Sequence, residues 1–429
     1  MKVLRFKDEF IRNTGLMFIG IGLFNLLNLL YHFFMIRLLP PVDYGHLNTL
    51  MALLMIISVP ASTVQTTITK FVSSYEVQRK YDQVRRMLRH LLSLVTLFAV
   101  CIFLLIVLGS SFLTAFFQIS SRKLVLLFGI LLLLNMVTQV PVGGLQGLQR
   151  FGWLTINYIT NGGTKFILGI LFVLLGWGVL GAMGAIVISY FISTFLSLLV
   201  LKIYVSKLKG PPLQEQKEEE SEASYVSEVA RYFFHVGVTL LCYMILTNID
   251  LILVKHFFTP IEAGYYSIAQ MVGKIILFLP IPVLTVMFPK LTSSQGQEEK
   301  RLPILKKSLL IAALLCSVAV ITGLIFPSLI IRVLTGKEYP DCIPLVRFFC
   351  ISMSFFALIL ILIYYHLSSH RRSFLYSLFL LTLAQIVLIV LFHETLSQVL
   401  IIVGGVGFCL FLVNLYLAYH SGSRKGEVL

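Results

Sequence analysis

A short stretch of this chain occurs twice: Pro41-Val42-Asp43-Tyr44-Gly45 returns in the second half as Pro260-Ile261-Glu262-Ala263-Gly264. Pro60 likewise returns as Pro280, and one single-residue gap brings these two matches into the same register. Because each half of the chain is about as long as the separation between the matches, the sequence indicates a duplication. In a membrane protein, such a duplication is typical of a transporter whose site lies between the two halves.

The composition is that of a membrane protein. Of 429 residues, 58% are hydrophobic and 12% are charged, and the mean hydropathy is +0.93. Apolar runs long enough to cross a hydrocarbon core ~30 Å thick follow one another along the chain. The sequence therefore predicts an all-α polytopic membrane protein with twelve transmembrane helices, at residues 14–36, 47–69, 91–117, 124–146, 152–175, 179–201, 232–256, 266–288, 308–330, 343–367, 374–392 and 398–419.

The twelve spans divide into two repeats of six. An even number of spans gives the second repeat the same orientation as the first, so the repeats are parallel and face each other across a central cleft. We expect an N-terminal six-helix lobe at residues 1–203 and a C-terminal six-helix lobe at residues 231–429. Residues 204–230 between them contain a polar, acidic run, which predicts a flexible cytoplasmic linker, either a hinge or a plain connection.

The net charge of +15 is distributed in a way that argues against nucleic acid as a partner. With the N-terminus in the cytoplasm, 25 of the 34 Lys and Arg residues fall in cytoplasmic segments and 7 at the outer side, while Lys165 and Lys274 lie inside spans. This positive-inside bias predicts a cytoplasmic membrane protein with both termini in the cytoplasm. The basic residues then face the anionic headgroups of membrane lipids.

Motifs of enzymes are missing from the sequence. HExxH, GxSxG and the phosphate-binding GxxxxGK[ST] motif are absent, and the six cysteines show no paired spacing. We therefore expect no catalytic residue, no metal and no cofactor. A polytopic membrane enzyme of glycan assembly remains an alternative, although such an enzyme needs inward-facing carboxylates.

Asp250 is the only one of the nineteen acidic residues that falls inside a predicted span. A carboxylate in hydrocarbon is costly, so it should face a cavity or a partner. Asp250 is therefore a candidate for coupling to a proton or sodium ion, for contacting a polar substrate, or for a structural ion pair. Asp250 and Lys274 both lie ~10 Å from the outer ends of consecutive spans, so we hypothesise that they pair.

Lys165 lies in the middle of a span with no acid nearby in the sequence. A buried lysine of this kind should face water or an anionic ligand. Together with Lys274 and Arg37, Lys165 could line a cavity for an anionic substrate such as a pyrophosphate headgroup, although interfacial snorkelling also explains Arg37. Amides in the spans suit either interhelical hydrogen bonds or sugar hydroxyls, and the candidates are Asn28, Gln65, Gln139 and Asn248.

Prolines fall at places where moving helices need them. Pro60 and Pro280 occupy matching positions in the two halves, and Pro141 lies in the fourth span. These prolines predict kinks that serve either gating or simple packing. Asp43 and Glu262 follow a proline at the start of a span, and we interpret both as structural helix caps.

The stretch Arg37-Leu-Leu-Pro-Pro-Val-Asp-Tyr-Gly45 resembles the signature of bacterial polysaccharide and oligosaccharide exporters. Its second-half echo, Asn248-Ile-Asp250 followed by Glu262-Ala-Gly-Tyr-Tyr-Ser267, is similar. These exporters are the lipid-linked oligosaccharide flippases of the multidrug/oligosaccharidyl-lipid/polysaccharide exporter superfamily. The resemblance implies a V-shaped twelve-helix fold that flips undecaprenyl-pyrophosphate-linked oligosaccharide by alternating access, coupled to an ion. It also implies contacts with other polysaccharide-assembly proteins.

Two other members of that superfamily remain alternatives. A cation-coupled multidrug exporter typically uses an acid in its first half, and spans 1–6 contain none. A peptidoglycan-precursor flippase carries clustered arginines early in the chain, and the first span lacks them. The two halves of the chain differ mainly in charge, because the register that aligns Pro41 with Pro260 also aligns Tyr31 with Asp250, and Lys165 with Ala384 next to Gln385.

Overall fold

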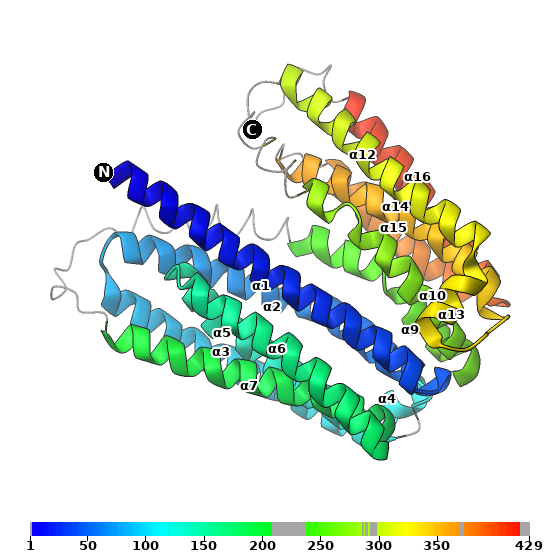
Figure 1. Cartoon of the computed structure of the whole chain (residues 1–429), viewed down its shortest axis with the longest axis horizontal. Helices are drawn as coiled ribbons and strands as arrows, with labels where there is room; N and C mark the ends of the chain where they lie inside the picture. Colours follow the sequence, from blue (N-terminus) through cyan, green and yellow to red (C-terminus); the bar gives the residue numbers. More distant parts are fainter. Residues whose placement is uncertain are drawn as a thin grey trace. The chain divides into compact units, whose positions relative to one another are not determined.

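The computed structural model describes residues 2–119, 121–207, 237–284, 287, 291, 298–368 and 373–420, and the regular elements among them are all helices. Two compact units make up the chain: residues 1–50 with 57–225, and residues 51–56 with 226–429 (Figure 1). The predicted linker lies outside the described residues, except for residues 204–207 at the end of the last helix of the first unit. The domain boundaries and the linker therefore stay predictions.

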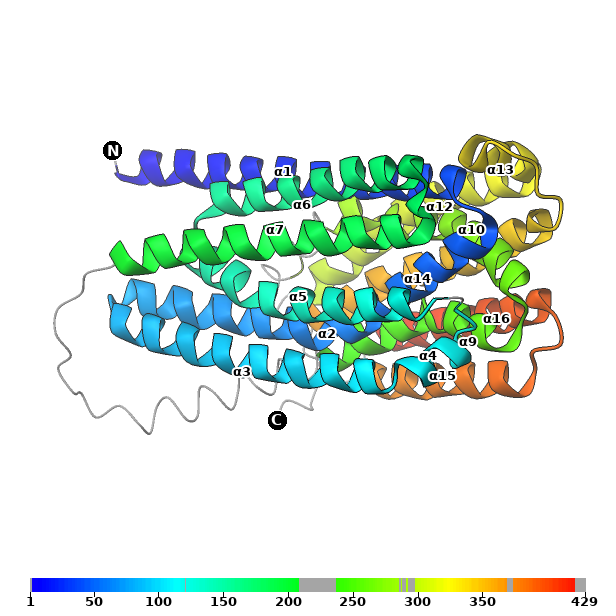
Figure 2. The same cartoon turned by 90° about the horizontal axis from the view of Figure 1, so that it is seen from below.

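The first unit is a bundle in which α6 and α5 are the central packing elements. α6 packs on α1 and α7, while α5 packs on α3 and α7 (Figures 1 and 2). A π-helical turn, Val173–Trp177, joins α6 to α7, and in it Gly176 has a φ of +87°, which glycine adopts readily. The helices are α1 (Lys2–Leu38), α2 (Pro41–Val77), α3 (Tyr81–Leu108), α4 (Ser110–Phe116), α5 (Arg122–Gly147), α6 (Phe151–Phe172) and α7 (Gly178–Lys207).

Two glycines bring α5 against the backbone of α2. A Cβ atom on Gly143 would lie 2.8 Å from the carbonyl oxygen of Gln65, and one on Gly147 would lie 2.9 Å from that of Thr69. Small residues four positions apart allow helices in membranes to pack this closely. Larger side chains at either position would push the two helices apart.

The second unit is built around α14. This helix packs on α10, α12 and α16, and α9 packs on α10, α15 and α16. The described elements are a helical segment at Gly237–Leu246, α9 (Ile249–Phe257), α10 (Pro260–Phe278), α12 (Glu298–Ile325), α13 (Pro327–Thr335), α14 (Cys342–Ser368), α15 (Ser373–Leu391) and α16 (Leu396–His420).

The number of membrane spans matches the sequence-based prediction. In the described part of the chain, 10 helices are long and apolar enough to cross a membrane, and the bent pair Gly237–Leu246 and Ile249–Phe257 raises the count to 11. One of the 10 is the stretch Phe151–Ser206, which contains both α6 and α7 packed side by side. Separating these two helices gives twelve spans, six in each unit. The all-α twelve-helix fold class is thereby confirmed.

Two predicted spans end earlier than expected. α3 ends at Leu108 and α12 ends at Ile325, and each is followed by a short separate helix, α4 or α13 (Figure 2). Gly109 separates the first pair, and Pro327 starts the second short helix. Because α3 and α12 are the third spans of their repeats, the two short helices that follow them are corresponding parts of the duplication.

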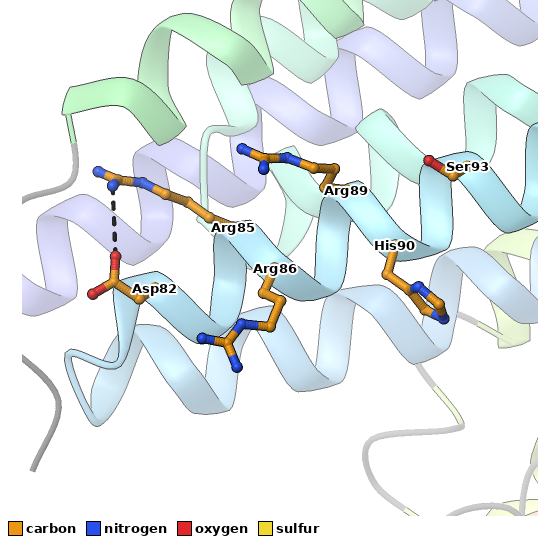
Figure 3. Close-up of a pocket in the computed structure, with 6 residues that line it drawn as sticks. All are labelled: Asp82, Arg85, Arg86, Arg89, His90 and Ser93. Carbon is orange, nitrogen blue, oxygen red and sulfur yellow. Dashed lines mark ion pairs between the residues drawn. The ribbon is translucent and has the colours of Figure 1, made fainter. Parts of the chain in front are cut away.

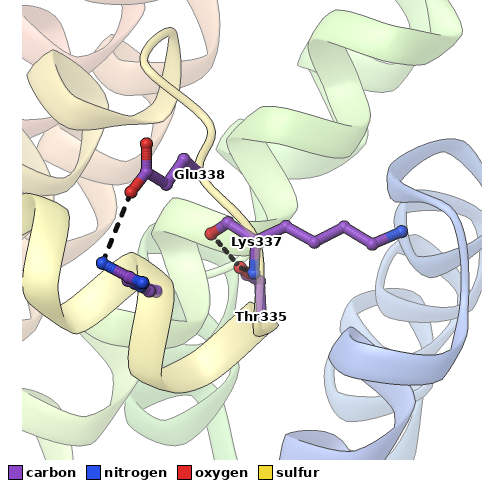
Figure 4. Close-up of polar contacts among 4 residues, drawn as sticks. Thr335, Lys337 and Glu338 are labelled. Carbon is purple, nitrogen blue, oxygen red and sulfur yellow. Dashed lines mark hydrogen bonds and ion pairs between the residues drawn. The ribbon is translucent and has the colours of Figure 1, made fainter.

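The end of α13 requires a glycine. Gly336 has a φ of +72°, in the left-handed region, and its N–H donates to the carbonyl of Arg332. The Thr335 hydroxyl accepts a hydrogen bond of 3.1 Å from the Lys337 N–H, and Arg332 pairs with Glu338 at 3.6 Å (Figure 4). Both charged side chains are mostly exposed, so this ion pair contributes little to stability.

The duplicated Pro-x-acid-x-Gly element caps its two helices differently. In the second unit, Thr259 is the N-cap of α10 and forms a capping box with Glu262, as predicted for that acid. In the first unit, the N-cap of α2 is Pro40, which has no N–H to donate to Asp43. Asp43 therefore forms no capping box, but its charge lies in the first turn of α2, where it is favourable for the helix dipole, as expected.

The two matched prolines also differ in setting. α2 continues through Pro60, and α5 continues through Pro141. α10 instead ends at Phe278, two residues before Pro280. A role of these prolines in gating stays a prediction.

Candidate functional site

The span that carries Asp250 is broken, which the sequence did not predict. Gly237–Leu246 and Ile249–Phe257 meet at an angle of 42° around Thr247 and Asn248. The Asn248 amide donates back to the Met244 carbonyl at 2.9 Å, and the Thr247 hydroxyl donates to the Tyr243 carbonyl at 2.9 Å. Side chains that bond to the preceding turn in this way compete with the helical ladder and favour its end.

Asp250 lies in the first turn of α9, directly after the break, and its side chain is fully buried. Its carboxylate accepts hydrogen bonds from the Tyr266 hydroxyl at 2.8 Å and from the Gln270 amide at 3.4 Å. The backbone N–H of Leu251 also donates to it, as expected at a helix N-terminus, where N–H groups are free. A buried carboxylate therefore has the donors that its burial demands.

Lys274 acts on Asp250 through charge, without a direct bond. The two groups interact electrostatically, but in the described part of the chain no ion pair joins them. Tyr266, Gln270 and Lys274 follow one another at four-residue spacing and so share one face of α10. The partners of Asp250 are thus the first two of these residues.

Two unpaired oxygen atoms lie beside the same break. Gln385 on α15 donates from its amide nitrogen to the Leu246 carbonyl at 2.9 Å. In the described residues, its Oε1 and the Oδ1 of Asn248 are buried without a hydrogen-bond donor. Buried polar atoms normally have a partner, so each of these orphans needs an explanation. A carboxylate, two amide oxygens and a helix break together suit the binding of a small cation.

In the first unit, Lys165 occupies a comparable site. Its side chain is 7% exposed, its Nζ donates to Asn28 Oδ1 at 2.7 Å, and it lies 4.3 Å from the centroid of the Tyr31 ring. Tyr31 is held in turn by a 3.0 Å hydrogen bond to the Ala182 carbonyl. In the part of the chain that the structure describes, no carboxylate forms an ion pair with this ammonium.

The duplication relates the two sites. The register of the repeat places Asn28 on Thr247 or Asn248, Tyr31 on Asp250, and Lys165 on Ala384 or Gln385. Each trio comes from the first and fifth spans of its unit, α1 with α6 and α9 with α15, and both helix pairs pack together. Corresponding pairs of helices in the two units therefore each hold a buried charged residue, Lys165 in the first unit and Asp250 in the second.

The remaining candidate residues make ordinary structural contacts. Arg37 is exposed at the end of α1 with its guanidinium 4.3 Å from the Phe33 ring centroid, nine residues and so ~13 Å along the helix from Asn28. Gln65 donates to Gln146 at 3.0 Å, and Gln139 donates to a backbone carbonyl one turn earlier. Arg37 is thus separate from the Lys165 site, and a substrate-binding role for these residues stays a prediction.

Two tyrosines and one lysine were missed by sequence reasoning. Tyr31 and Tyr266 contact the buried charges directly, and the four-residue spacing of Tyr266, Gln270 and Lys274 is a signal that could have found the second. Lys255 falls at the outer end of the predicted span 232–256, and the structure buries it fully in the last turn of α9. A lysine at the end of an apolar run has no sequence signal that separates a buried setting from an exposed one.

Comparison with known proteins identifies the family. Residues 10–295 match the model of the family described as "Polysaccharide biosynthesis protein", and the chain belongs to that family. It is also 23% identical, over 237 residues, to the "uncharacterized membrane protein MJ1375" of Methanocaldococcus jannaschii; the match covers 54% of this chain and spans only 56% of that protein.

Two solved structures show the same fold. An inward-facing multidrug resistance MATE family transporter of the MOP superfamily superposes with a TM-score of 0.75 and 14% identity, over 96% of this chain and 100% of the other. The lipid II flippase MurJ, in an inward closed conformation, superposes with a TM-score of 0.70 and 15% identity, over 94% and 87%. The match to the family model gives the family of the chain, and these two structures show that it has the fold of a MATE transporter and of a lipid II flippase.

Proposed function

We propose that this protein is a flippase that moves an undecaprenyl-pyrophosphate-linked oligosaccharide across the cytoplasmic membrane by alternating access, coupled to a cation. The observation that supports this proposal most is the pair of related sites with opposite charge, Lys165 in the first unit and Asp250 in the second. A substrate with an anionic head needs a positive group, and a coupling cation needs a negative one.

Lys165 is suited to hold a phosphate group of the substrate. An ammonium has three donors, and Asn28 takes one of them while the Tyr31 ring covers a face. The absence of a carboxylate partner among the described residues leaves charge for an anionic ligand. Phosphates attract such a group strongly where water is scarce, because charge-assisted hydrogen bonds are stronger there.

Asp250 is suited to bind the coupling cation. Its carboxylate lies next to a helix break, where Asn248 Oδ1 and Gln385 Oε1 have no donor in the described part of the chain. A sodium ion would satisfy these oxygens together, whereas a proton would satisfy only the carboxylate. In the first unit, the ammonium of Lys165 fills the corresponding place. These differences favour sodium over a proton.

The proposed membrane and orientation rest on the distribution of charge. The excess of Lys and Arg in alternate segments supports a cytoplasmic membrane location with both termini in the cytoplasm. The substrate would then be received from sugar-transferring enzymes inside and delivered to polymerising proteins outside, so contacts with polysaccharide-assembly proteins are part of the proposal.

A reconstitution experiment tests the transport activity. The full chain is placed in liposomes with a fluorescent oligosaccharide on undecaprenyl pyrophosphate, and the fraction exposed to an impermeant glycosidase is followed over time. We expect exposure to increase with the protein and to depend on an imposed sodium gradient. Transport of a cationic dye without any flipping of the glycolipid would instead support the drug-exporter alternative and overturn the proposal.

The coupling to a cation is tested by introducing a lysine into the second unit at the position that corresponds to Lys165. Gln385→Lys places an ammonium beside the break, where the equivalent Lys165 sits in the first unit. We expect sodium to stabilise the wild type in thermal melts and to have no such effect on this variant. Gln78→Lys adds the same charge at an exposed position and should leave the sodium response intact. An unchanged sodium response in Gln385→Lys would refute the site.

A further inference from the structure

The N-terminal end of α3 carries a polar hollow that belongs to neither charged site. The hollow has a volume of about 530 Å³. Two of its charged residues already have partners. Arg85 forms an ion pair with Asp82 at 3.5 Å and donates a hydrogen bond to the Val205 carbonyl at 3.1 Å. Among the described residues, those that line the hollow all lie on α3, and they are Asp82, Arg85, Arg86, Arg89, His90 and Ser93 (Figure 3).

Two arginines of the hollow remain available for a ligand. Arg86 and Arg89 are both exposed. Among the described residues, neither guanidinium has a hydrogen-bond or ion-pair partner. Figure 3 shows Arg89 on the same side of α3 as Arg85 and Ser93, and Arg86 on the side of His90. The hollow therefore presents two guanidinium groups, those of Arg86 and Arg89, that have no partner among the described residues and lie within one turn of α3.

The hollow continues directly into an apolar surface of the same helix. Leu97 follows Ser93 by one turn and is 67% exposed, and Leu108 at the end of the helix is 80% exposed. From Ser93 to Leu104 the helix rises ~16 Å, which is about half of a hydrocarbon core ~30 Å thick. Further exposed apolar residues on this face are Leu94, Phe98, Leu104 and Leu105. A ligand here must have a charged head and a hydrocarbon tail.

The repeat-related helix α12 provides a contrast. Lys306 and Lys307 are exposed in its N-terminal part, followed by exposed Leu310, Leu314 and Val318. Lys306 lies 5.5 Å from the Tyr419 ring centroid and is thus already engaged. Lysine presents a point charge, whereas the planar fork of arginine binds two phosphate oxygens at once. The difference indicates that α3 is adapted to phosphate beyond the general preference for positive charge.

We infer that the hollow on α3 binds the phosphate of an anionic membrane phospholipid, whose acyl chains lie along the apolar face from Leu94 to Leu108. Arg86 and Arg89 bind the phosphate oxygens, and Ser93 offers a hydroxyl one turn deeper to the ester region. Such a lipid sets the depth of α3 in the leaflet. This inference does not depend on the nature of the transported substrate.

Native mass spectrometry of the full chain tests the inference. The protein is titrated in detergent with phosphatidylglycerol or phosphatidylcholine, and retained lipids are counted. We expect wild type to retain phosphatidylglycerol preferentially and Arg86→Gln/Arg89→Gln to bind it roughly tenfold more weakly or worse. Lys306→Gln/Lys307→Gln removes the same charge from the corresponding place in α12 and should retain the lipid. Arg86→Lys/Arg89→Lys keeps the charge without the fork and should be intermediate.

Several outcomes would overturn the inference. Equal loss of lipid in Arg86→Gln/Arg89→Gln and in Lys306→Gln/Lys307→Gln would show that only total charge matters. Retention of polyprenyl phosphate in place of phosphatidylglycerol would assign the hollow to the substrate lipid. Competition by inorganic phosphate alone would remove the need for a lipid tail. If Arg86→Gln/Arg89→Gln fails to fold, Arg86→Lys/Arg89→Lys must still bind phosphatidylglycerol more weakly than wild type. Unchanged binding in that variant refutes the inference.

Discussion

The two units share a scaffold, but their related sites carry opposite charges, on the fifth span of the first unit at Lys165 and on the first span of the second unit at Asp250. In the first unit, Lys165 is tied to Asn28 and to the Tyr31 ring, so the positive charge is part of the chain. In the second, Asp250 is the charge, and Gln385 takes the place of the lysine with one oxygen unpaired.

The two sites therefore differ in where their positive charge comes from: the Lys165 side chain supplies it in the first unit, and the proposed bound cation supplies it at Asp250 in the second. At the Lys165 site the ammonium belongs to the chain itself and attracts anions. The site around Asp250 has oxygen atoms but no ammonium within bonding distance among the described residues, so a cation must come from solution. The following predictions are ordered from the largest expected effect to the smallest.

Removing the negative charge should have the largest effect. Asp250→Asn keeps the shape and one hydrogen-bond acceptor but removes the charge that attracts the cation. Loss of a buried, hydrogen-bonded charge costs about 3 kcal/mol, so gradient-driven flipping should fall by about 100-fold in the proteoliposome assay. Glu338→Gln removes an exposed acid from the same unit and should flip normally; a normal rate in Asp250→Asn would contradict the coupling role.

Removing the positive charge of Lys165 should have the next largest effect, and it should change KM for the substrate. Lys165→Gln keeps a hydrogen bond to Asn28 but cannot attract a phosphate. We expect KM for the pyrophosphate-linked substrate to rise by roughly 30-fold, with the sodium response unchanged. Lys202→Gln, an exposed residue on α7, is the matched control. A changed sodium response in Lys165→Gln would mean that the two sites do not have separate roles.

A smaller effect is expected from displacing the Tyr31 ring without changing any charge. A Cβ atom on Gly169 would lie 2.5 Å from Cε2 of Tyr31, so Gly169→Ala must displace the ring from its present contact with Lys165. We expect KM to rise by about fivefold, because such overpacking costs about 1 kcal/mol or more. A Cβ on Gly163 of the same helix meets nothing within 4 Å; Gly163→Ala should match wild type in the same measurement.

The smallest effect concerns Lys274. Because charge but no ion pair connects it to Asp250 in the described structure, the coupling energy in a double-mutant cycle of Asp250→Asn and Lys274→Gln should stay below about 1 kcal/mol. Thermal stability and flipping rate are measured for the four proteins of the cycle. A coupling of several kcal/mol would establish the direct pair that the sequence suggested.

The fold was largely predictable because its signals are local. Apolar runs separated by short loops determine the spans, and the recurrence of the element around Asp43 at Glu262 reveals the duplication. Charge inside an apolar run is equally visible, so Asp250 and Lys165 stood out without any structure. Short interruptions were not predictable in this way, since Gly109 before α4 lies within a run that remains apolar on both sides.

The partners of the buried charges depend on contacts that no local pattern contains. Tyr266 reaches Asp250 from the next helix, and Gln385 reaches the Leu246 carbonyl from 139 residues away. The break at Thr247 and Asn248 arises because two polar side chains bond to the preceding turn while α15 takes up a freed carbonyl. A hydropathy pattern records only how apolar a stretch is, so it describes this span as continuous.

The amino-acid sequence by itself thus determined that the chain spans a membrane, the twelve spans, the duplication and the short list of buried charges, because each follows from hydropathy, length and spacing along the chain. Only the tertiary structure decided which groups meet those charges. It placed Asn28 and Tyr31 on Lys165, gave Asp250 its donors from α10, and left two amide oxygens unpaired beside the helix break in the described part of the chain. The physical reason is that burial makes a charge costly wherever it lies, whereas its compensation depends on helices distant in sequence packing against one another.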